Sequence, residues 1–384
     1  MEQILKKMVK DKIRFDCRHY SGYKPCGYAE FCSDCDHFES IKERILIIKL
    51  GALGDVLRTT CILPGIKKKY PLSHITWITE SNGIPLLKDN PYIDSLWIFD
   101  AAGVLTVCSH TFDIAMNFEK VEPALALMDA ANARKKRGFA FSGAKTLFVA
   151  NEASLYALQL GLNDELKFRH NKKTYQEIIY EMAEIPYNGE GYVLHLSEKA
   201  QEFSRHARKR FGIKPEKPTI GLNTGCGGVF ETKRWTRQGF CELAQKLASE
   251  KNCNLLLLGG KREIDFNNAI LDKCSAPLID TGCHNTLEEF LGIMQICDVV
   301  VSSDSLAMHI ALALEKQVVV FFGSTCPQEV NLFGRGEKII TDFTCSPCYK
   351  KQCDMSPSCM DELNAQTVFE AVCRRLNALS SIRK

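Results

Sequence analysis

The sequence predicts an α/β protein in which two doubly wound parallel sheets face each other across a cleft. The 384 residues suit two to three domains. Short, almost purely apolar runs alternate with amphipathic helical stretches. This alternation stops over residues 187–218 and then starts again. Strands and helices in alternation are typical of a parallel sheet, because crossover helices cover both of its faces.

The first half of the chain, residues 44–205, opens with an apolar run at 44–50 that we expect to be a central strand. A glycine turn at 51–55 and a helical pattern over 56–70 follow, and Pro71 ends that helix. Runs rich in β-branched and aromatic residues predict further strands at 75–79, 95–99 and 113–118.

The second half, residues 206–364, repeats this pattern. Its expected strands lie at 219–223, 254–258, 298–302 and 318–322. Small or polar residues follow the later strands, and open parallel sheets bind ligands at these carboxyl ends. The other segments are a cysteine-rich extension at 1–43, a cysteine-rich loop at 344–360 and a final helix at 365–384.

The composition excludes several classes of protein. Apolar residues make up 45% of the chain and charged residues 25%, as in ordinary folded domains. The net charge is only +3, so we expect no nucleic-acid partner. The longest apolar runs are far shorter than the ~20 residues of a membrane-spanning helix. Charges interrupt the N-terminal residues where a secretory signal would be apolar, and we therefore expect a cytoplasmic protein.

The glycine turn at 51–55 is the first candidate for chemistry. Gly54 lets the backbone approach a ligand, and Asp55 opens the following helix. Taken alone, Asp55 is more simply a residue that interacts with the helix dipole. Arg58 lies one turn later on the same side and is a candidate for binding an acceptor. The turn lacks the GxGxxG pattern, which disfavours a nicotinamide dehydrogenase.

A second group of candidates follows the strand at 298–302. Asp304 or Ser305 can cap the next helix, whose free amide groups suit a diphosphate. His309 lies one turn after Ser305 and points toward the helix start, although a lone histidine there is more often a packed residue.

Two further loops carry polar groups at strand ends. The glycine-rich loop at 223–235 can wrap a phosphate, and it delivers Lys233, whose charge suits a leaving group. The simpler interpretation of this loop is a surface segment with solvated cations. Glu263 follows the strand at 254–258 and can hold ribose hydroxyls. Each signal is weak alone, but their corresponding positions at strand ends reinforce one another.

Four motifs and the C-terminal tail carry a family resemblance. The motifs read ILIIKLGALGDVLRTT, LNTGCGGVFETKRW, LGGKRE and VVSSDSLAMHIALALEKQVVVFFGST. They resemble those of glycosyltransferase family nine, the lipopolysaccharide heptosyltransferases, and the tail CSPCYKKQC resembles that of the heptosyltransferase II branch. The resemblance covers about residues 44–376. It implies the GT-B fold, with two Rossmann-like domains that bind the acceptor in the N-terminal domain and the nucleotide sugar in the C-terminal one.

The resemblance also implies a role for each candidate residue. Asp55 matches the general base, Lys233 the lysine that neutralises the donor diphosphate, and Glu263 the ribose-binding carboxylate. The donor-binding residues that it implies are Gly54, Thr224, Lys233, Glu263, Asp304, Ser305, Leu306 and His309. Common members have glycine where this chain has Leu306, so we expect either a shifted donor or a different sugar nucleotide. The cysteine-rich extension is absent from the better-known members.

The chain contains eighteen cysteines, which in a reducing compartment suggest thiols or metal ligands before disulfides. Two clusters could each form a thiolate site for structural zinc or iron, with free or partly buried thiols as the alternative. The C-terminal cluster is Cys345, Cys348, Cys353 and Cys359. The N-terminal cluster is Cys17, Cys26, Cys32 and Cys35, with His19 and His37 nearby.

The leading hypothesis is an inverting glycosyltransferase that moves a sugar from a nucleotide-diphospho-sugar to a glycan hydroxyl. By the resemblance, the sugar is heptose from ADP-heptose and the acceptor is a lipopolysaccharide core or a related glycan. Asp55 would take the proton of the attacking hydroxyl, while Lys233, His309 and the helix amides stabilise the leaving diphosphate, with no cofactor required for catalysis.

Alternative hypotheses are transfer of another sugar, a protein acceptor, and a non-catalytic metal-binding scaffold on the same fold. The basic runs at 67–69 and 134–137 indicate either a solvated face or peripheral contact with anionic lipid at the cytoplasmic membrane face.

Overall fold

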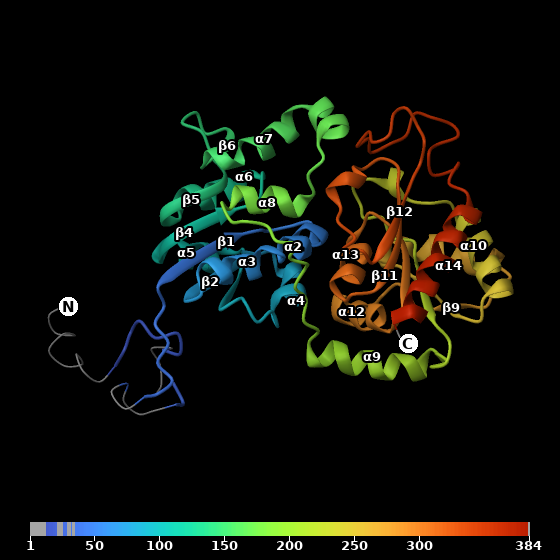
Figure 1. Ribbon diagram of the computed structural model, residues 1–384, viewed down its shortest axis with the longest axis horizontal. Helices are drawn as coiled ribbons and strands as arrows, with labels where there is room; N and C mark the ends of the chain where they lie inside the picture. Colours follow the sequence, from blue (N-terminus) through green and yellow to red (C-terminus); the bar gives the residue numbers. More distant parts are fainter. Residues whose placement is uncertain (1–12, 21–25, 29–31, 33–34, 383–384) are drawn as a thin grey trace.

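The computed structural model describes residues 13–20, 26–28, 32 and 35–382 of the chain. Two six-stranded sheets with helices packed on them form two domains that lie next to each other (Figure 1). In both sheets the first and fourth strands of the domain are central neighbours. The second and third strands follow on one side and the fifth and sixth on the other. This arrangement confirms the predicted pair of doubly wound domains.

The first domain contains a mixed sheet. Its strands, in spatial order, are β3 (Ser95–Ile98), β2 (Ser73–Thr79), β1 (Glu43–Ile48), β4 (Thr111–Asn117), β5 (Asn132–Phe141) and β6 (Leu147–Val149). All neighbours are parallel except β5 and β6, which form an antiparallel pair. Its helices are α2 (Leu53–Thr59), α3 (Ile62–Lys69), α4 (Ile84–Leu87), α5 (Ala101–Ser109), α6 (Glu122–Ala130), α7 (Leu155–Leu162), the π-helix η4 (Leu166–His170) and α8 (Tyr175–Met182).

The second domain contains a fully parallel sheet. Its strands, in spatial order, are β12 (Gly336–Ile340), β11 (Gln317–Phe322), β10 (Val299–Ser303), β7 (Thr219–Asn223), β8 (Asn254–Leu258) and β9 (Leu278–Asp280). Its helices are α9 (Glu198–Arg210), α10 (Arg237–Glu250), α11 (Ile264–Lys273), α12 (Leu287–Ile296), α13 (Leu306–Ala313) and α14 (Ala365–Ile382). Short 3₁₀ turns follow three strands: η5 (Glu231–Lys233), η6 (Lys261–Glu263) and η7 (Pro327–Glu329).

The central strands are buried on both faces, as their apolar runs predicted. In β1, Ile45 and Ile47 pack with α2 and α3, whereas Leu46 and Ile48 pack with α5 and α6 on the other face. All four side chains are fully buried. Successive strand residues point to opposite faces, so only a strand covered on both sides tolerates such a continuous apolar run.

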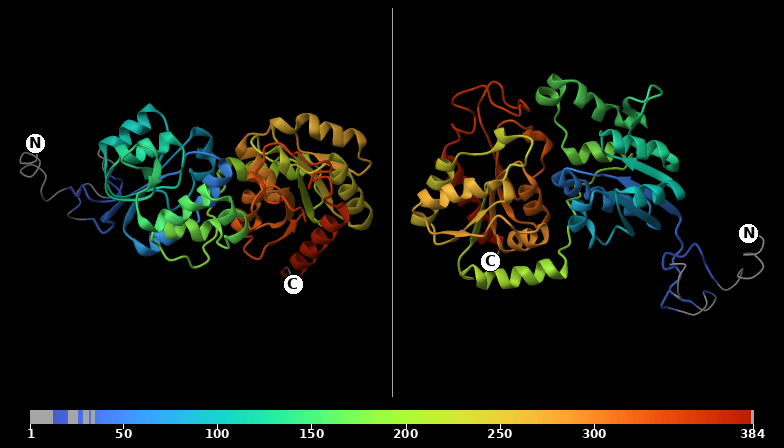
Figure 2. Two further views of the ribbon diagram at one scale, coloured as in Figure 1. Left: turned by 90° about the horizontal axis from the view of Figure 1, so that it is seen from above. Right: turned by 180° about the vertical axis from the view of Figure 1, so that it is seen from behind.

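The strand order reverses between β1 and β4 in the first sheet and between β7 and β10 in the second. Connections diverge at such a point and leave a crevice at the carboxyl ends of the strands. The helices that start at the two crevices, α2 and α13, pack against each other between the domains (Figures 1 and 2). The fold therefore brings the two predicted ligand-binding ends together.

The helix predicted after the first strand was wrong in its bounds. The helix expected over 56–70 is divided into α2 and α3, because Pro64 has no N–H to donate to the Thr60 carbonyl. The domain boundary expected between residues 205 and 206 falls inside α9. That helix packs on α12, where an added Cβ at Gly292 would lie only 2.7 Å from the Ala200 carbonyl oxygen.

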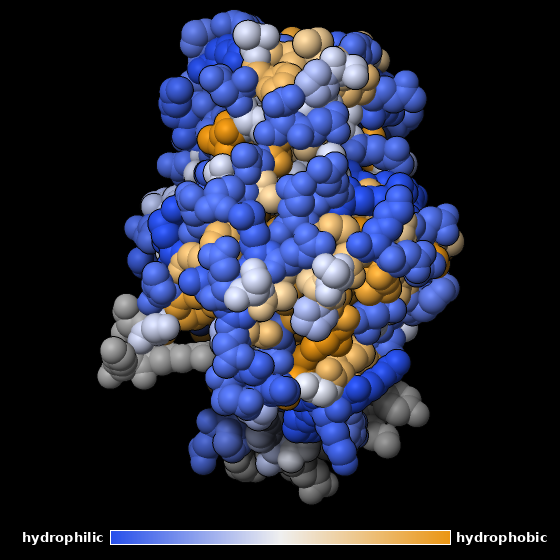
Figure 3. All heavy atoms as spheres, turned by 90° about the vertical axis from the view of Figure 1, so that its right-hand side faces the viewer, coloured by the Kyte–Doolittle hydropathy of each residue, from blue (hydrophilic) through white to orange (hydrophobic). Residues whose placement is uncertain are grey.

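The outer surface of the second domain is mainly hydrophilic, with apolar patches between the polar side chains (Figure 3). Within the described residues, no helix combines the length and the apolar character that crossing a bilayer requires.

Candidate active site

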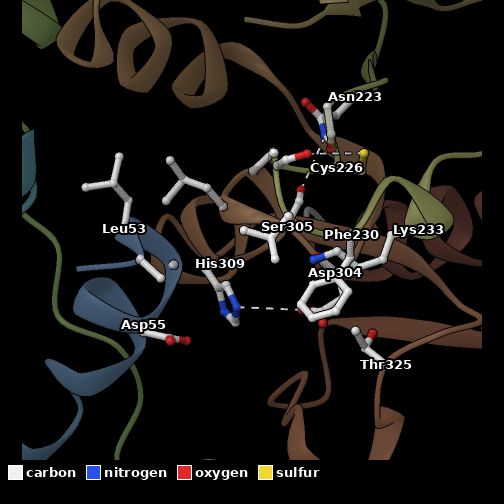
Figure 4. Close-up of a pocket in the computed structure, with 18 of the residues that line it drawn as sticks. Leu53, Asp55, Asn223, Cys226, Phe230, Lys233, Asp304, Ser305, His309 and Thr325 are labelled. Carbon is white, nitrogen blue, oxygen red and sulfur yellow. Dashed lines mark hydrogen bonds and ion pairs between the residues drawn. The ribbon is translucent and has the colours of Figure 1, made fainter. Parts of the chain in front are cut away.

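A cavity of about 730 Å³ lies between the domains, at the carboxyl ends of their central strands (Figure 4). The loops after β1, β7, β8, β10 and β11 contribute to its walls. Asp55 projects from α2, His309 lies between the domains, and Lys233 and Asp304 lie on the far side of His309 (Figure 4). The strand-end candidates of both halves of the chain thus surround one space.

Asp55 is a carboxylate that the first domain presents to this cavity. Its helix follows a tight turn in which Ala52 adopts a φ of 43°. Arg58 Nη2 lies 2.9 Å from Asp55 Oδ1, and Lys49 Nζ lies 3.9 Å from Oδ2. Burial favours the neutral carboxyl, but the charges of Arg58 and Lys49 outweigh this effect and lower its pKa. Asp55 is therefore ionised at neutral pH and can accept a proton.

A buried ion pair supports the turn that carries Asp55. Lys49 Nζ donates to Glu119 Oε1 at 2.7 Å, and the same oxygen accepts the backbone N–H groups of Leu50 and Gly51 at 3.1 Å. Sequence reasoning missed both Lys49 and Glu119. A lysine at the end of a buried apolar strand was the available signal, because lysine is almost never buried without a partner.

Arg58 borders the cavity, as predicted for an acceptor-binding residue, but its guanidinium is already engaged. Besides the ion pair with Asp55, its Cζ lies 3.7 Å from the centre of the Tyr175 ring. Burial would lower the pKa of Arg58, yet the Asp55 carboxylate outweighs it and raises that pKa. Arg58 is thus placed to hold the Asp55 carboxylate in position. Its contact with an acceptor stays a prediction.

The start of α13 forms the opposite wall. The prediction that a side chain caps this helix was wrong, because Ser305 Oγ lies 2.9 Å from Ser302 Oγ and does not bond the helix amides. Leu306, the first helical residue, lines the cavity next to them. An uncapped helix start offers N–H donors and a partial positive charge to an anion.

His309 is buried between the two domains. Its Nε2 lies 3.9 Å from Asp304 Oδ1. Burial, reinforced by the charge of Arg58, lowers the pKa of His309 to about 4. The imidazole is therefore neutral at pH 7 in this structure, so the predicted stabilisation of the diphosphate by His309 would come from a hydrogen bond and not from a positive charge.

Gly54 allows the close approach of the domains at His309. A Cβ added at Gly54 would lie 3.0 Å from His309 Cδ2 and 3.9 Å from the Leu306 Cα. Gly54 also lines the cavity, where it was predicted to bind the donor. Because Gly54 has no side chain, α2 can pack closely against α13 at this point.

Lys233 and Glu263 lie where the sequence placed them, at the strand ends of the second domain. Lys233 Nζ donates to the Asp304 carbonyl oxygen at 2.6 Å, which fixes its charge beside the start of α13. Glu263 accepts the Gly260 N–H at 3.0 Å and lies 3.3 Å from Arg234 Nη2. Both residues line the cavity.

Thr224 does not take the donor-binding place predicted for it. Its side chain is buried, and its Oγ1 donates to Asn267 Oδ1 at 2.6 Å and lies 3.0 Å from the Leu258 carbonyl oxygen. It is not among the cavity-lining residues, whereas its neighbours Asn223 and Gly225 are. The hydroxyl therefore joins β7 to β8 and α11 instead of facing a ligand.

The two basic runs are largely engaged within the first domain. Lys67 Nζ lies 3.0 Å from Asp94 Oδ2. Arg137 is buried, and its Nη2 lies 2.8 Å from Glu184 Oε2. These contacts support a structural role for the runs more than an open basic patch.

Neither cysteine cluster forms a metal site in this structure. The C-terminal thiols line a separate cavity of about 310 Å³ in the loop before α14. Backbone hydrogen bonds hold this loop instead, since the N–H groups of Cys348 and Tyr349 both donate to the Ser324 carbonyl oxygen. Among the residues that the structure describes, no three cysteine, histidine or acidic side chains are arranged to hold a metal ion.

The N-terminal cysteine cluster lies on the first domain, away from the second domain and the cavity (Figures 1 and 2). Cys17 is buried where it pairs with Ser40, and Cys32 Sγ accepts the Arg14 N–H at 3.2 Å. Arg18 anchors the segment, with its Nη1 2.5 Å from Asp94 Oδ1.

The loop with the C-terminal cysteines contacts the first domain. Arg169 of η4 donates to the backbone oxygens of Thr344 and Ser346 at 3.0 and 3.1 Å. The Phe168 ring stacks on Tyr349, with ring centres 5.4 Å apart and planes 2° apart. Because Tyr349 also lines the cavity, this contact between the domains supports one of its walls.

Comparison with known proteins identifies relatives over most of the chain. The model of glycosyltransferase family 9 (heptosyltransferase) matches residues 105–358. Lipopolysaccharide heptosyltransferase 1 of Campylobacter coli is 21% identical over 344 residues, which cover 86% of this chain and 98% of that protein.

Solved structures share the fold. The E. coli ADP-heptose lipopolysaccharide heptosyltransferase II aligns with a TM-score of 0.65 at 18% identity, covering 88% of this chain and 99% of that one. The iron-containing dodecameric glycosyltransferase TibC of enterotoxigenic E. coli aligns with a TM-score of 0.53 at 13% identity, covering 88% and 77%. These likenesses confirm the predicted pair of Rossmann-like domains.

Proposed function

Because the chain belongs to glycosyltransferase family 9 (heptosyltransferase), we propose that it moves a heptose from ADP-heptose to a hydroxyl of a lipopolysaccharide core, with inversion at the anomeric carbon. The names of its relatives support the donor and the acceptor. One observation carries the mechanism. The ionised carboxylate of Asp55 shares a cavity with Lys233 and an uncapped helix start from the other domain.

In the proposed reaction Asp55 takes the proton of the acceptor hydroxyl while that oxygen attacks the anomeric carbon. The bond to the diphosphate breaks on the opposite face, which inverts the configuration. Lys233 and the first amides of α13 then stabilise the charge that develops on the departing nucleoside diphosphate. These groups provide a base on one side of the sugar and cationic or N–H groups on the other.

The remaining residues bind and orient the donor in this proposal. Glu263 Oε2 accepts the Gly260 N–H and Oε1 accepts a hydrogen bond from Arg234, and we assign the remaining acceptor capacity of this carboxylate to ribose hydroxyls. Neutral His309 can donate or accept one hydrogen bond at the diphosphate without adding charge. Leu306 lines the cavity at the start of α13, and we expect its apolar side chain to affect how the donor phosphates fit there.

A structural metal at the C-terminal cysteine loop remains a proposal. Cys345, Cys348, Cys353 and Cys359 line one small cavity, and four thiolates suit zinc or iron. The iron content of the structural neighbour TibC supports this possibility. The thiols are not assembled as a metal site here, so no step of the reaction is assigned to a metal. Metal analysis of wild type and Cys345→Ser would decide between a bound metal and free thiols.

Product analysis tests the proposed function. Purified protein is given ADP-heptose or another nucleotide sugar, together with a lipopolysaccharide-core acceptor or a protein acceptor, and the products are identified by mass spectrometry. We expect a mass increase of one heptose on the core acceptor and, by NMR, an inverted anomeric linkage. Use of another donor or of a protein acceptor would contradict the heptose or core assignment. Retention of configuration would contradict the role given to Asp55.

A further inference from the structure

Glu329 is a carboxylate in the active-site cavity that the proposed reaction leaves without a role. It ends η7, directly after the loop that follows β11, and its side chain is partly exposed to the cavity. Within the described part of the chain, its carboxylate forms no ion pair within 4.0 Å and no side-chain hydrogen bond.

Most other charged groups around the cavity are already engaged, and the Asp304 carboxylate lies 3.9 Å from His309 Nε2. Asp55 pairs with Arg58, and Glu263 accepts the Gly260 N–H. Lys233 donates to the carbonyl oxygen of Asp304. Because the Glu329 side chain is partly exposed to the cavity, its carboxylate oxygens are accessible and can accept hydrogen bonds from the hydroxyl groups of a ligand.

The surroundings of Glu329 place it at the sugar end of the cavity. Its charge acts on Arg58 of the first domain and on Tyr349 of the cysteine loop, which lie near Asp55 and the wall between the domains. The ribose and diphosphate groups, by contrast, are assigned to Glu263, Lys233 and the start of α13. Glu329 therefore borders the space where the transferred sugar and the acceptor sugar meet.

We infer that Glu329 determines sugar specificity: it accepts hydrogen bonds from the hydroxyls of an uncharged sugar ring and disfavours a ring that carries a carboxylate or phosphate at that position. The inference rests on the proposed sugar transfer and narrows its substrate class. An ionised acceptor strengthens hydrogen bonds from hydroxyls, whereas a second anion in the same partly buried space is repelled. Repulsion of the wrong ligand is a common source of specificity.

The test compares wild type with Glu329→Gln, which keeps the shape of the side chain and removes the charge. Glu250→Gln is the matched control, since Glu250 ends α10 on the surface of the second domain, away from the cavity. Transfer is measured with ADP-heptose and two acceptors, one with an uncharged sugar at the reacting position and one with a carboxylate-bearing sugar there. Binding of ADP, ADP-heptose and each acceptor is measured by calorimetry.

For Glu329→Gln we expect kcat/KM with the uncharged acceptor to fall about tenfold, the loss typical of a hydrogen bond to a charged group. We expect relative use of the carboxylate-bearing acceptor to rise. Glu329→Asp keeps the charge but shortens the side chain. We expect its kcat/KM with the uncharged acceptor to fall, while its discrimination against the carboxylate-bearing acceptor stays as in wild type. A change confined to the KM of ADP-heptose would assign the contact to the transferred sugar, and a change confined to the acceptor KM would assign it to the acceptor.

Failure of this inference is distinct from failure of the proposed function. If wild type transfers heptose and Glu329→Gln stays within twofold of it for both acceptors, the inference is overturned and the proposed function stands. If wild type binds these ligands without turnover, the proposed function fails. In that case the inference is tested only by whether Glu329→Gln binds ADP-heptose or the acceptors more weakly than wild type does. If wild type binds neither nucleotide sugar nor acceptor, both are overturned.

Discussion

The two domains place their strands in the same order, yet the loops at the strand ends differ in chemistry. In the first domain two ion pairs, Lys49 with Glu119 and Asp55 with Arg58, crowd the end of β1. In the second domain the corresponding ends present glycines, serines, helix amides and a neutral histidine, with Lys233 as a cation beside them. In the proposed reaction, the same fold therefore provides a proton acceptor on one side and groups that suit a phosphate on the other.

This difference fits the two roles proposed for the domains, which are to accept a proton and to bind a diphosphate. A carboxylate that takes a proton at neutral pH needs nearby cations that keep it ionised despite its burial. A diphosphate needs N–H donors and one or two positive charges, and side chains that fill or neutralise the helix start would exclude it. Four substitutions test this difference between the two domains.

The largest effect is expected for Asp55→Asn, which removes the proposed general base and keeps the shape of the side chain. We expect kcat to fall about 10³-fold, the usual contribution of a general base, while the affinity for ADP changes little. Steady-state transfer assays and calorimetry measure the two quantities. A residual rate within tenfold of wild type would show that the first domain does not supply the base.

Replacing His309 tests whether its imidazole is neutral in the folded protein. The measured quantity is the pH dependence of the free energy of unfolding. Its folded-state pKa of about 4 lies below the ordinary 6.5, so above pH 6.5 it adds no pH dependence. As pH falls from 6.5 toward 4, the unfolded state binds a proton that the folded state does not, and stability decreases. The total loss is on the order of 3 kcal/mol.

The pH dependence is measured by urea unfolding at several pH values. His309→Gln should remove this acid-side loss, whereas His206→Gln, on the exposed surface of α9, should retain it. If the free energy of unfolding changes with pH equally in wild type and His309→Gln between pH 6.5 and 4, His309 binds a proton as readily in the folded protein as in the unfolded chain.

Lys233→Met removes the cation at the start of α13. We expect kcat to fall about 10²-fold, because the charge that develops on the diphosphate loses one stabilising group. Lys233→Arg should recover part of the rate, since it restores the charge. Normal turnover by Lys233→Met would indicate that the helix amides suffice and that Lys233 only fixes the loop.

Gly54→Ala tests the contact that joins the two sides. The new Cβ meets His309 Cδ2 at 3.0 Å, so α2 and α13 must separate slightly. Overpacking of this kind costs about 1–3 kcal/mol, and we expect a loss of kcat/KM of about tenfold. Gly143→Ala is the matched control, since no atom lies within 4 Å of its added Cβ. Equal activity of the two variants would show that the domains do not need this close approach.

Several parts of the site were predictable from the sequence. Asp55, Lys233, Glu263 and the start of α13 lie in the segments that follow buried strands, and parallel sheets gather such strand ends at one edge. The prediction that the Thr224 side chain faces the donor was wrong, because a residue next to a glycine loop can point into the sheet as easily as into the cleft. The missed pair Lys49 and Glu119 lies 70 residues apart in the chain, beyond any local pattern.

The α/β class, the repeated strand–helix pattern and the positions of the strand-end loops could be predicted from the sequence, because hydrophobic periodicity and turn residues are local properties. Three states of the site follow only from the folded structure: Arg58 pairs with Asp55, His309 is neutral, and the Glu329 carboxylate has no ion-pair partner among the described residues. Those states depend on desolvation and on charges from distant segments, which act through space and not along the chain.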